Sequence, residues 1–74
     1  MVLYLNPAKD KVYLSNATIG TPFKIFDIKG LNVKSGLINN LVEEIDINEL
    51  TPGVYYIDIK HGNFGNRRWK FVKE

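Results

Sequence analysis

The chain of 74 residues contains no cysteine, one tryptophan and one histidine, and these scarcities exclude several classes of protein. Without cysteine there is neither a disulfide framework nor a cysteine zinc site. No apolar run approaches the ~20 residues of a membrane helix, and Met1 is not followed by the basic-then-apolar layout of a secretory signal. The length leaves room for one thin core, so residues 1–74 are expected to form a single domain.

The charge is small in total but unevenly placed. The formal net charge is +2. Residues 1–64 carry six lysines and seven acidic residues, whereas residues 65–74 carry four basic residues and Glu74. Positive charge is therefore concentrated at the end of the chain, and the rest lacks the broad basic stripe of a nucleic-acid-binding domain.

Alternation of apolar and polar residues dominates the sequence, interrupted by Gly, Pro and Asn about every ten residues, which is typical of an all-β sandwich or barrel. In the clearest segment, Tyr55, Ile57 and Ile59 share one face and are expected to point into the core. The predicted strands are residues 2–5, 11–15, 21–28, 31–38, 43–47, 53–60 and 66–73.

Two strands have further features. In the last one, alternation places Trp69 and Phe71 on the buried face and leaves Arg68 and Lys70 in water. In "FKIFDI" the apolar residues change parity partway along, so we expect a β-bulge near Asp27.

The segment "INELTPGVY" indicates a corner between two strands. Asn48 is expected to cap one short helical turn, which Pro52 and Gly53 then end. Tyr55 follows at once, and an aromatic hydroxyl that bonds back to upstream backbone is the tyrosine corner of Greek-key sandwiches. The predicted fold class is therefore all-β, a seven-stranded antiparallel Greek-key (immunoglobulin-like) β-sandwich.

An enzymatic function has little support. Glu44 and Asp46 lie on one strand face with roughly 7 Å between their Cα atoms, which superficially suits a paired-carboxylate hydrolase. A chain this short has nothing left to build a substrate cleft around them, and alternating acids are typical of a half-solvated strand. No hydroxyl residue has a histidine or an acid near it in a nucleophilic pattern. The hydroxyl residues considered are Ser15, Thr18, Ser35 and Thr51.

The loop "KHGNFGN" offers two further candidates, and we expect neither a metal nor a cofactor there. His61 has no second ligand at metal spacing and is interpreted as a turn residue. "GNFG" resembles the phosphate-clamping loop of KH domains, but that loop needs helices on both sides and both flanks here are strands. The glycosylation tripeptide at residues 16–18 occurs by chance too often to carry weight.

The basic segment "RRWKF" raises the question of nucleic-acid binding, since OB-fold and cold-shock modules interleave bases with aromatics. A stacking platform needs its aromatics exposed beside the charges. Here alternation puts Trp69 and Phe71 opposite Arg68 and Lys70, so no nucleic-acid partner is expected.

Four segments carry a resemblance to a known family. "YLNPAKDKVYL" resembles the opening of the C-terminal sorting domains of the type IX secretion system of Bacteroidota, with Leu5 where the family usually has proline. "IFDIKGLNVKS", "IDINELTPGVYYIDIK" and "WKFVKE" are similar to later family segments, in the same order. The similarity runs from Tyr4 to Glu74, and this order and spacing make it far more specific than any one motif.

The resemblance assigns the family pattern to nine positions. Six are architectural, because they turn the chain or pack in the core, and three are polar groups that the fold does not obviously require. Translocon recognition is implied for the polar three. The architectural positions are Asn6, Pro7, Gly30, Leu50, Gly53 and Tyr55. The recognition positions are Asp10, Lys70 and Lys73, and both lysines are expected to project into water.

By this resemblance, the domain is a non-catalytic export address at the C-terminus of a larger secreted protein. It implies an N-terminal cargo that passes through the periplasm, an outer-membrane type IX translocon that recognises the domain, and a sortase-like cysteine peptidase that removes it at the cell surface. Neither membrane insertion nor a cofactor is implied. The alternative is an immunoglobulin- or fibronectin-like adhesion or carbohydrate-binding module, which an exposed aromatic platform would favour.

Overall fold

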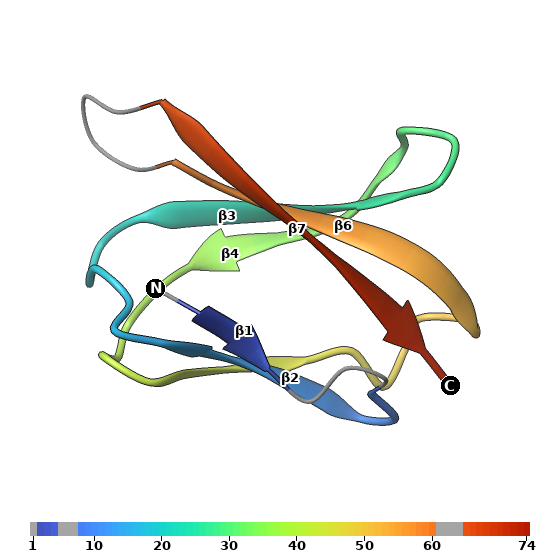
Figure 1. Cartoon of the computed structure of the whole chain (residues 1–74), viewed down its shortest axis with the longest axis horizontal. Coiled ribbons are helices and arrows are strands. Elements are labelled where there is room, and N and C mark those ends of the chain that lie inside the picture. The colour runs from blue at the N-terminus through green and yellow to red at the C-terminus, as the bar shows by residue number, and fades with distance from the viewer. Residues whose placement is uncertain (1, 5–7, 61–64) are drawn as a thin grey trace.

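The computed structural model describes residues 2–4, 8–60 and 65–74, and these form two antiparallel β-sheets packed face to face (Figure 1). The strands are β1 (Val2–Tyr4), β2 (Lys11–Ser15), β3 (Pro22–Asp27), β4 (Asn32–Leu37), β5 (Glu43–Asp46), β6 (Gly53–Lys60) and β7 (Asn66–Lys73). One sheet has the strand order β1-β2-β5 and the other β4-β3-β6-β7. The prediction of an all-β sandwich with seven strands is confirmed. Across the described ranges, no helix has the length and apolar character needed to span a membrane.

The strands begin and end within one residue of the predicted ranges. A register shift is present beside the predicted place, but its extra residue lies on the neighbouring strand: Ile25 faces Lys34 and Phe26 faces Asn32, so Val33 of β4 is unpaired in the ladder. β3 itself pairs with β6 without a shift. Plain alternation therefore places Phe26 on the outer side, half-buried and next to Tyr56, and Ile28 beyond it is exposed.

The core fills the space between the sheets with alternate residues from five strands. Side chains such as Ile57, Ile59 and Phe71 are completely inaccessible to solvent. Each fully buried aliphatic or aromatic side chain contributes about 1.5 to 3 kcal/mol relative to exposure, so these few residues dominate the stability of the domain. Other fully buried members of the core are Val12, Leu14, Ile25, Ile38 and Ile47.

Burial along β7 is uneven. Phe71 is fully buried, as predicted, but Trp69 is only half-buried and packs against the edge of the core. The three-stranded sheet cannot cover the four-stranded sheet completely, and β7 is an edge strand of the larger sheet. The guanidinium of Arg67 lies over the Trp69 ring, 5.9 Å from its centroid, and covers part of what the second sheet leaves open.

The hairpin between β3 and β4 is fixed by one carboxylate. Oδ1 of Asp27 accepts hydrogen bonds from the backbone N–H groups of Lys29 at 2.9 Å and Leu31 at 3.0 Å. Gly30 completes the turn with a φ of 86°, a left-handed conformation that glycine adopts without steric cost. The expected turn at Gly30 is thereby confirmed.

The corner before β6 differs from the prediction in one respect. Asn48 does not cap a helical turn; the chain makes a simple turn in which Leu50 N–H donates to the Ile47 carbonyl at 3.0 Å. The capping group is instead the carboxylate of Asp46, which accepts a hydrogen bond from Asn48 N–H at 2.9 Å. The three residues between Ile47 and Thr51 are too few for a helix once Pro52 limits the conformation of the residue before it.

The tyrosine corner itself is confirmed. The Tyr55 hydroxyl donates to the Thr51 carbonyl at 2.6 Å, and the ring is 6% exposed, stacked on Phe71 at 5.7 Å between centroids. The corner therefore ties the entry of β6 to the core residue of β7.

Candidate recognition site at the paired chain ends

The segment that leads from β1 into β2 meets the C-terminal residues in the structure (Figure 1). Ala8 forms a parallel bridge with Lys73, in which Ala8 N–H donates to the Val72 carbonyl at 2.8 Å and Glu74 N–H donates to the Ala8 carbonyl at 2.7 Å. Asp10 extends the link to the other sheet, because its carbonyl accepts from Ile47 N–H at 2.8 Å. We call residues 8–10 together with residues 72–74 the terminal clasp.

Lys73 is buried in this clasp, and the expectation that it projects into water is wrong. Its side chain is 7% exposed, and its ammonium group donates a hydrogen bond to the Lys9 carbonyl. The physical reason is parity: Lys73 follows Phe71 by two positions, so both side chains point to the inner face. A lysine is tolerated there because its stem packs on apolar surface while its ammonium finds a backbone acceptor.

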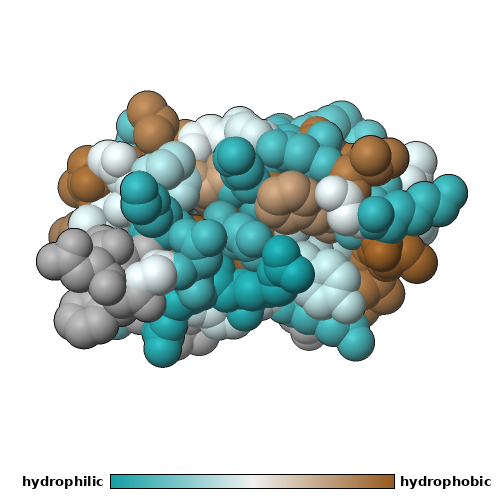
Figure 2. All heavy atoms as spheres, turned by 90° about the horizontal axis from the view of Figure 1, so that it is seen from above, coloured by the Kyte–Doolittle hydropathy of each residue, from teal (hydrophilic) through white to brown (hydrophobic). Residues whose placement is uncertain are grey.

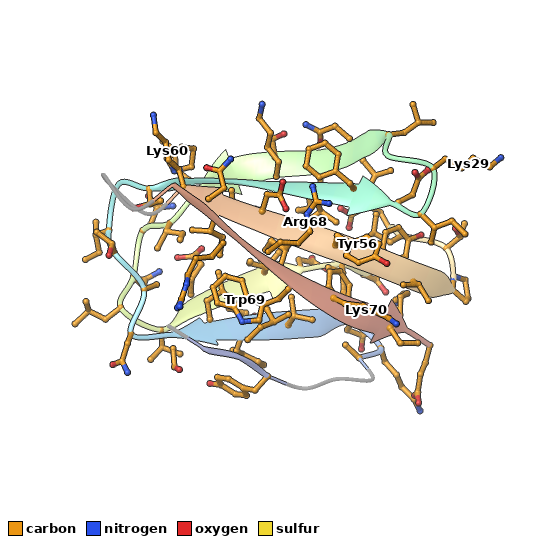
Figure 3. The ribbon with its side chains drawn as sticks, turned by 45° about the horizontal axis from the view of Figure 1, so that its top comes forward. Lys29, Tyr56, Lys60, Arg68, Trp69 and Lys70 are labelled. Atoms are coloured by element: carbon orange, nitrogen blue, oxygen red, sulfur yellow. The ribbon has the colours of Figure 1, made fainter. Side chains whose placement is uncertain are left out.

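The other two residues implied in recognition are exposed. Asp10 lies between Lys9 and β2 with its side chain in solvent, and Lys70 lies on the outer face of β7. The clasp brings Asp10 to the same end of the molecule as the close of β7. The structure therefore brings Asp10 and Lys73 into one clasp, while Lys70 stands outward on the neighbouring face (Figure 3).

The architectural positions of the family pattern lie where turns and core packing require them. Leu50 is 9% exposed and joins the core, and Gly53 begins β6 with a φ of 154°. Asn6 and Pro7 lie outside the described residues.

The two acidic residues of the paired-carboxylate pattern lie on the outer side of β5. Glu44 and Asp46 both point into solvent from β5, and Glu44 forms an ion pair with Lys11 of β2. The hydrogen bond from Lys11 to Glu44 raises the pKa of the Lys11 ammonium, with their charge attraction as a second cause. His61 and most of "GNFG" lie outside the described residues, and among the described ones no three metal-ligating side chains cluster.

Two features were missed from the sequence. Glu43 is buried, and its Oε1 accepts from the backbone N–H groups of Asn39 at 2.8 Å and Asn40 at 3.0 Å, which holds the loop before β5. On the outer face of the four-stranded sheet, Arg68 forms a bidentate pair with Asp58 at 2.6 and 2.9 Å. The strand alternation indicated the placement of Arg68, but its cross-strand partner depends on register.

One of three comparisons with known proteins found a match. The family model described as "Secretion system C-terminal sorting domain" matches residues 2–74. The chain belongs to this family. The searches of curated proteins and of solved structures found no match.

The family match covers the residues of the clasp as well as the segments of the sequence pattern. The match starts in β1 and reaches Glu74, so it includes both arms of the clasp. Domains of this family are C-terminal sorting signals of type IX secretion in Bacteroidota, non-catalytic in general, joined to an N-terminal cargo and directing export to the cell surface or beyond.

Proposed function

We propose that this sorting domain is the address that the outer-membrane type IX translocon reads on a cargo arriving in the periplasm by the general export route. At the cell surface, a sortase-like cysteine peptidase removes the domain from its cargo. Residues 1–74 act as one unit, a single domain at the end of the larger secreted protein. Family membership supports the proposal, and the pairing of residues 8–10 with residues 72–74 is the observation that carries it.

The clasp gives the proposal a physical form. Because Ala8 bonds to both Val72 and Glu74, the connection between β1 and β2 and the C-terminal residues hold one another in place. A translocon that contacts Asp10 at this end senses whether the domain is completely folded. Lys73 takes part indirectly, since its bond to the Lys9 carbonyl holds the segment that carries Asp10.

We also infer that the sandwich is immunoglobulin-like and Greek-key in its connectivity. The strand order β1-β2-β5 opposite β4-β3-β6-β7 supports this, because each sheet takes strands from both halves of the chain. The tyrosine corner at the entry of β6 supports it as well.

One observation bears on the alternative, an adhesion or carbohydrate-binding module. Tyr4 and Tyr13 stack on the outer side of the three-stranded sheet, with 5.3 Å between ring centroids and Tyr4 40% exposed. A sugar-binding platform presents open ring faces, whereas stacking covers one face of each ring. The pair favours the alternative less than an open platform would.

A secretion assay tests the proposal. A fluorescent reporter fused ahead of residue 1 is expected to reach the medium in a bacterium with the type IX machinery and to stay in the periplasm when the translocon is disabled. Changing both Asp10 and Lys70 to alanine is expected to retain reporter in the periplasm while the domain stays folded. Equal secretion with and without the translocon, or none with it, would refute the proposal.

A control isolates recognition from stability. Lys29 and Glu44 are two exposed residues of opposite charge that lie outside the clasp. Changing both to alanine leaves the net charge unchanged, as does changing Asp10 and Lys70. It is expected to be secreted like the unmodified fusion.

A further inference from the structure

The outer face of the four-stranded sheet carries most of the uncompensated positive charge of the strands. Figure 2 looks down on this side and shows hydrophilic residues gathered over its middle, with hydrophobic ones toward its ends. Lys24 of β3, Lys60 of β6 and Lys70 of β7 are all exposed here. We call these three lysines, with the Arg68–Asp58 pair between them, the lysine face.

The strand register fixes how these groups are arranged. Lys24, Asp58 and Arg68 lie in one row across β3, β6 and β7. The next row, about 7 Å along the strands, contains Phe26, Tyr56 and Lys70. Lys60 lies two positions beyond Asp58 on β6, and Figure 3 shows Lys60 and Lys70 on opposite sides of Arg68.

Arg68 is held rigidly at the centre of the face. Besides its bidentate bond to Asp58, its guanidinium lies over the rings of Tyr56 at 5.6 Å and Phe26 at 5.9 Å. The hydrogen bond from Arg68 lowers the pKa of the Asp58 carboxyl, so this acid remains charged and neutralises Arg68. Among the described residues on this face, Asp58 is the one acid, which leaves the three lysines without a carboxylate partner of their own.

The opposite outer face differs in charge. There Lys11 faces Glu44 and Asp46 across β2 and β5. Acids outnumber bases on that side, and the sandwich is electrically polarised from one outer face to the other. A charged partner would therefore be drawn to one side of the domain.

We propose that the lysine face is a docking surface for an acidic patch on a partner protein. Its lysines would pair with carboxylates, and the half-exposed rings of Phe26 and Tyr56 would provide the apolar contact between them. That the partner belongs to the export machinery rests on the proposed function.

The chemistry favours carboxylates over phosphates or sulfates. Bidentate recognition of phosphate uses the fork of arginine, and the fork of Arg68 is already occupied by Asp58. The lysines that remain are separate point charges, and aromatic rings fill the space between two of them. A protein surface offers scattered carboxylates and apolar groups together, whereas a nucleic acid or sulfated glycan offers a continuous row of anions.

The size of the face indicates brief contact. The lysine face spans three strands, roughly 10 Å across, and about 14 Å along them, so a flat contact on it covers less than the ~800 Å² per partner of a standard stable interface. A weak, electrostatically steered interface of this kind binds quickly and releases quickly. This suits an address that is read and then discarded.

Binding can be measured directly on the purified domain. The probe is a short peptide that alternates glutamate and tyrosine, titrated at low salt and followed by amide chemical shifts. We expect the shifts to cluster at residues 24–26, 56–60 and 68–70. Changing Lys24, Lys60 and Lys70 to glutamine is expected to weaken binding about tenfold or more, as for three lost exposed ion pairs.

The matched control changes Lys11, Lys29 and Lys34 to glutamine. These lysines lie off the lysine face and outside the clasp, and the net charge changes equally. Equal weakening by both triple variants would overturn the proposal, as would shifts centred elsewhere. Tighter binding of a heparin oligosaccharide or an oligonucleotide would assign the face to a polyanion, and salt-sensitive self-association lost in the face variant would assign it to a second copy.

The secretion assay separates this inference from the proposed function. If the unmodified fusion needs the translocon and the face variant is retained several-fold while remaining folded, both stand. If the face variant is secreted as well as the control, the docking surface fails and the address stands. If the unmodified fusion ignores the translocon, the address fails, and the peptide titration alone decides the docking surface.

Discussion

The corner before β6 depends on a single group, the hydroxyl of Tyr55. It donates to the Thr51 carbonyl at 2.6 Å from a ring that is 6% exposed. Tyr55→Phe should therefore lower the free energy of unfolding by about 1 to 2 kcal/mol, because the carbonyl loses its partner. Tyr56→Phe is the control, since that ring lies on the outer face, and should change stability by less than about 0.5 kcal/mol. Equal denaturant midpoints for the two variants would contradict the corner.

Lys73 and Lys70 are three positions apart, but only substitution of Lys73 should lower the stability of the domain. Lys73→Met keeps the packed stem but leaves the Lys9 carbonyl without its ammonium donor, so a loss of about 1 to 3 kcal/mol is expected. Lys70→Met changes an exposed side chain and should be nearly neutral. Thermal unfolding of both proteins measures the difference, and a tolerated change at Lys73 would show that the clasp does not need its bond.

The alternation that predicted Phe71 in the core also contained the burial of Lys73. At Phe71, an apolar side chain and an inward-pointing strand position both favour burial. At Lys73 the charged side chain favours exposure but the strand position points inward, and the side chain is buried. A buried lysine needs an acceptor, and the Lys9 carbonyl that provides it lies at the other end of the chain. No local pattern indicates such a partner.

Within β4, Gly36 is required by its neighbour on β3. It lies opposite Phe23, and a Cβ at Gly36 would approach Cζ of the Phe23 ring to 2.7 Å. Phe23 is 6% exposed and has little room to move, so Gly36→Ala should cost about 1 to 3 kcal/mol through overpacking. Phe23→Leu combined with Gly36→Ala should recover part of that loss. Additive losses in chemical denaturation would contradict the contact.

The pairing of Asp58 on β6 with Arg68 on β7 makes stability depend on pH. The pKa of Asp58 is lowered from its ordinary value of 3.8, so the folded state binds the proton less readily than the unfolded state. The stabilisation is therefore present above pH 4 and is lost as pH falls through the folded-state pKa. Asp58→Asn should lower the denaturant midpoint at pH 7, and the difference from the unmodified protein should shrink at pH 3. A difference that is independent of pH would contradict the linkage.

Strand positions could be predicted from the sequence because alternation is a local property. The tyrosine corner was equally visible, since it shows as a short motif, whereas the extra residue of the bulge lies on β4 and depends on the register with β3. The turn after β5 was not, because Asp46 and Asn48 both suit a cap and the choice depends on the direction of the strand. The lysine face depends on register among three strands, which alternation does not specify.

The terminal clasp is a property of the whole molecule, and truncation tests it. Deleting residues 69–74 removes Phe71 from the core and strips β7 from most of β6. Loss of a buried phenylalanine alone costs about 3 to 5 kcal/mol, and a small domain has about 5 to 15 kcal/mol to lose. The truncated chain should therefore show no cooperative thermal transition by circular dichroism.

Deleting only Glu74 separates the clasp from the core. It removes the N–H that donates to the Ala8 carbonyl but leaves Phe71 and Lys73 in place. This protein should fold, with a loss of about 1 kcal/mol for one hydrogen bond. Amide exchange should quicken at residues 8 and 47, because Ala8 donates to Val72 and Ile47 donates to Asp10 within the same clasp. If exchange at residues 8 and 47 is unchanged while Phe71 remains protected, residues 8–10 and residues 72–74 do not stabilise one another. If the chain truncated before Trp69 still unfolds cooperatively, the closing strand is not needed for the fold.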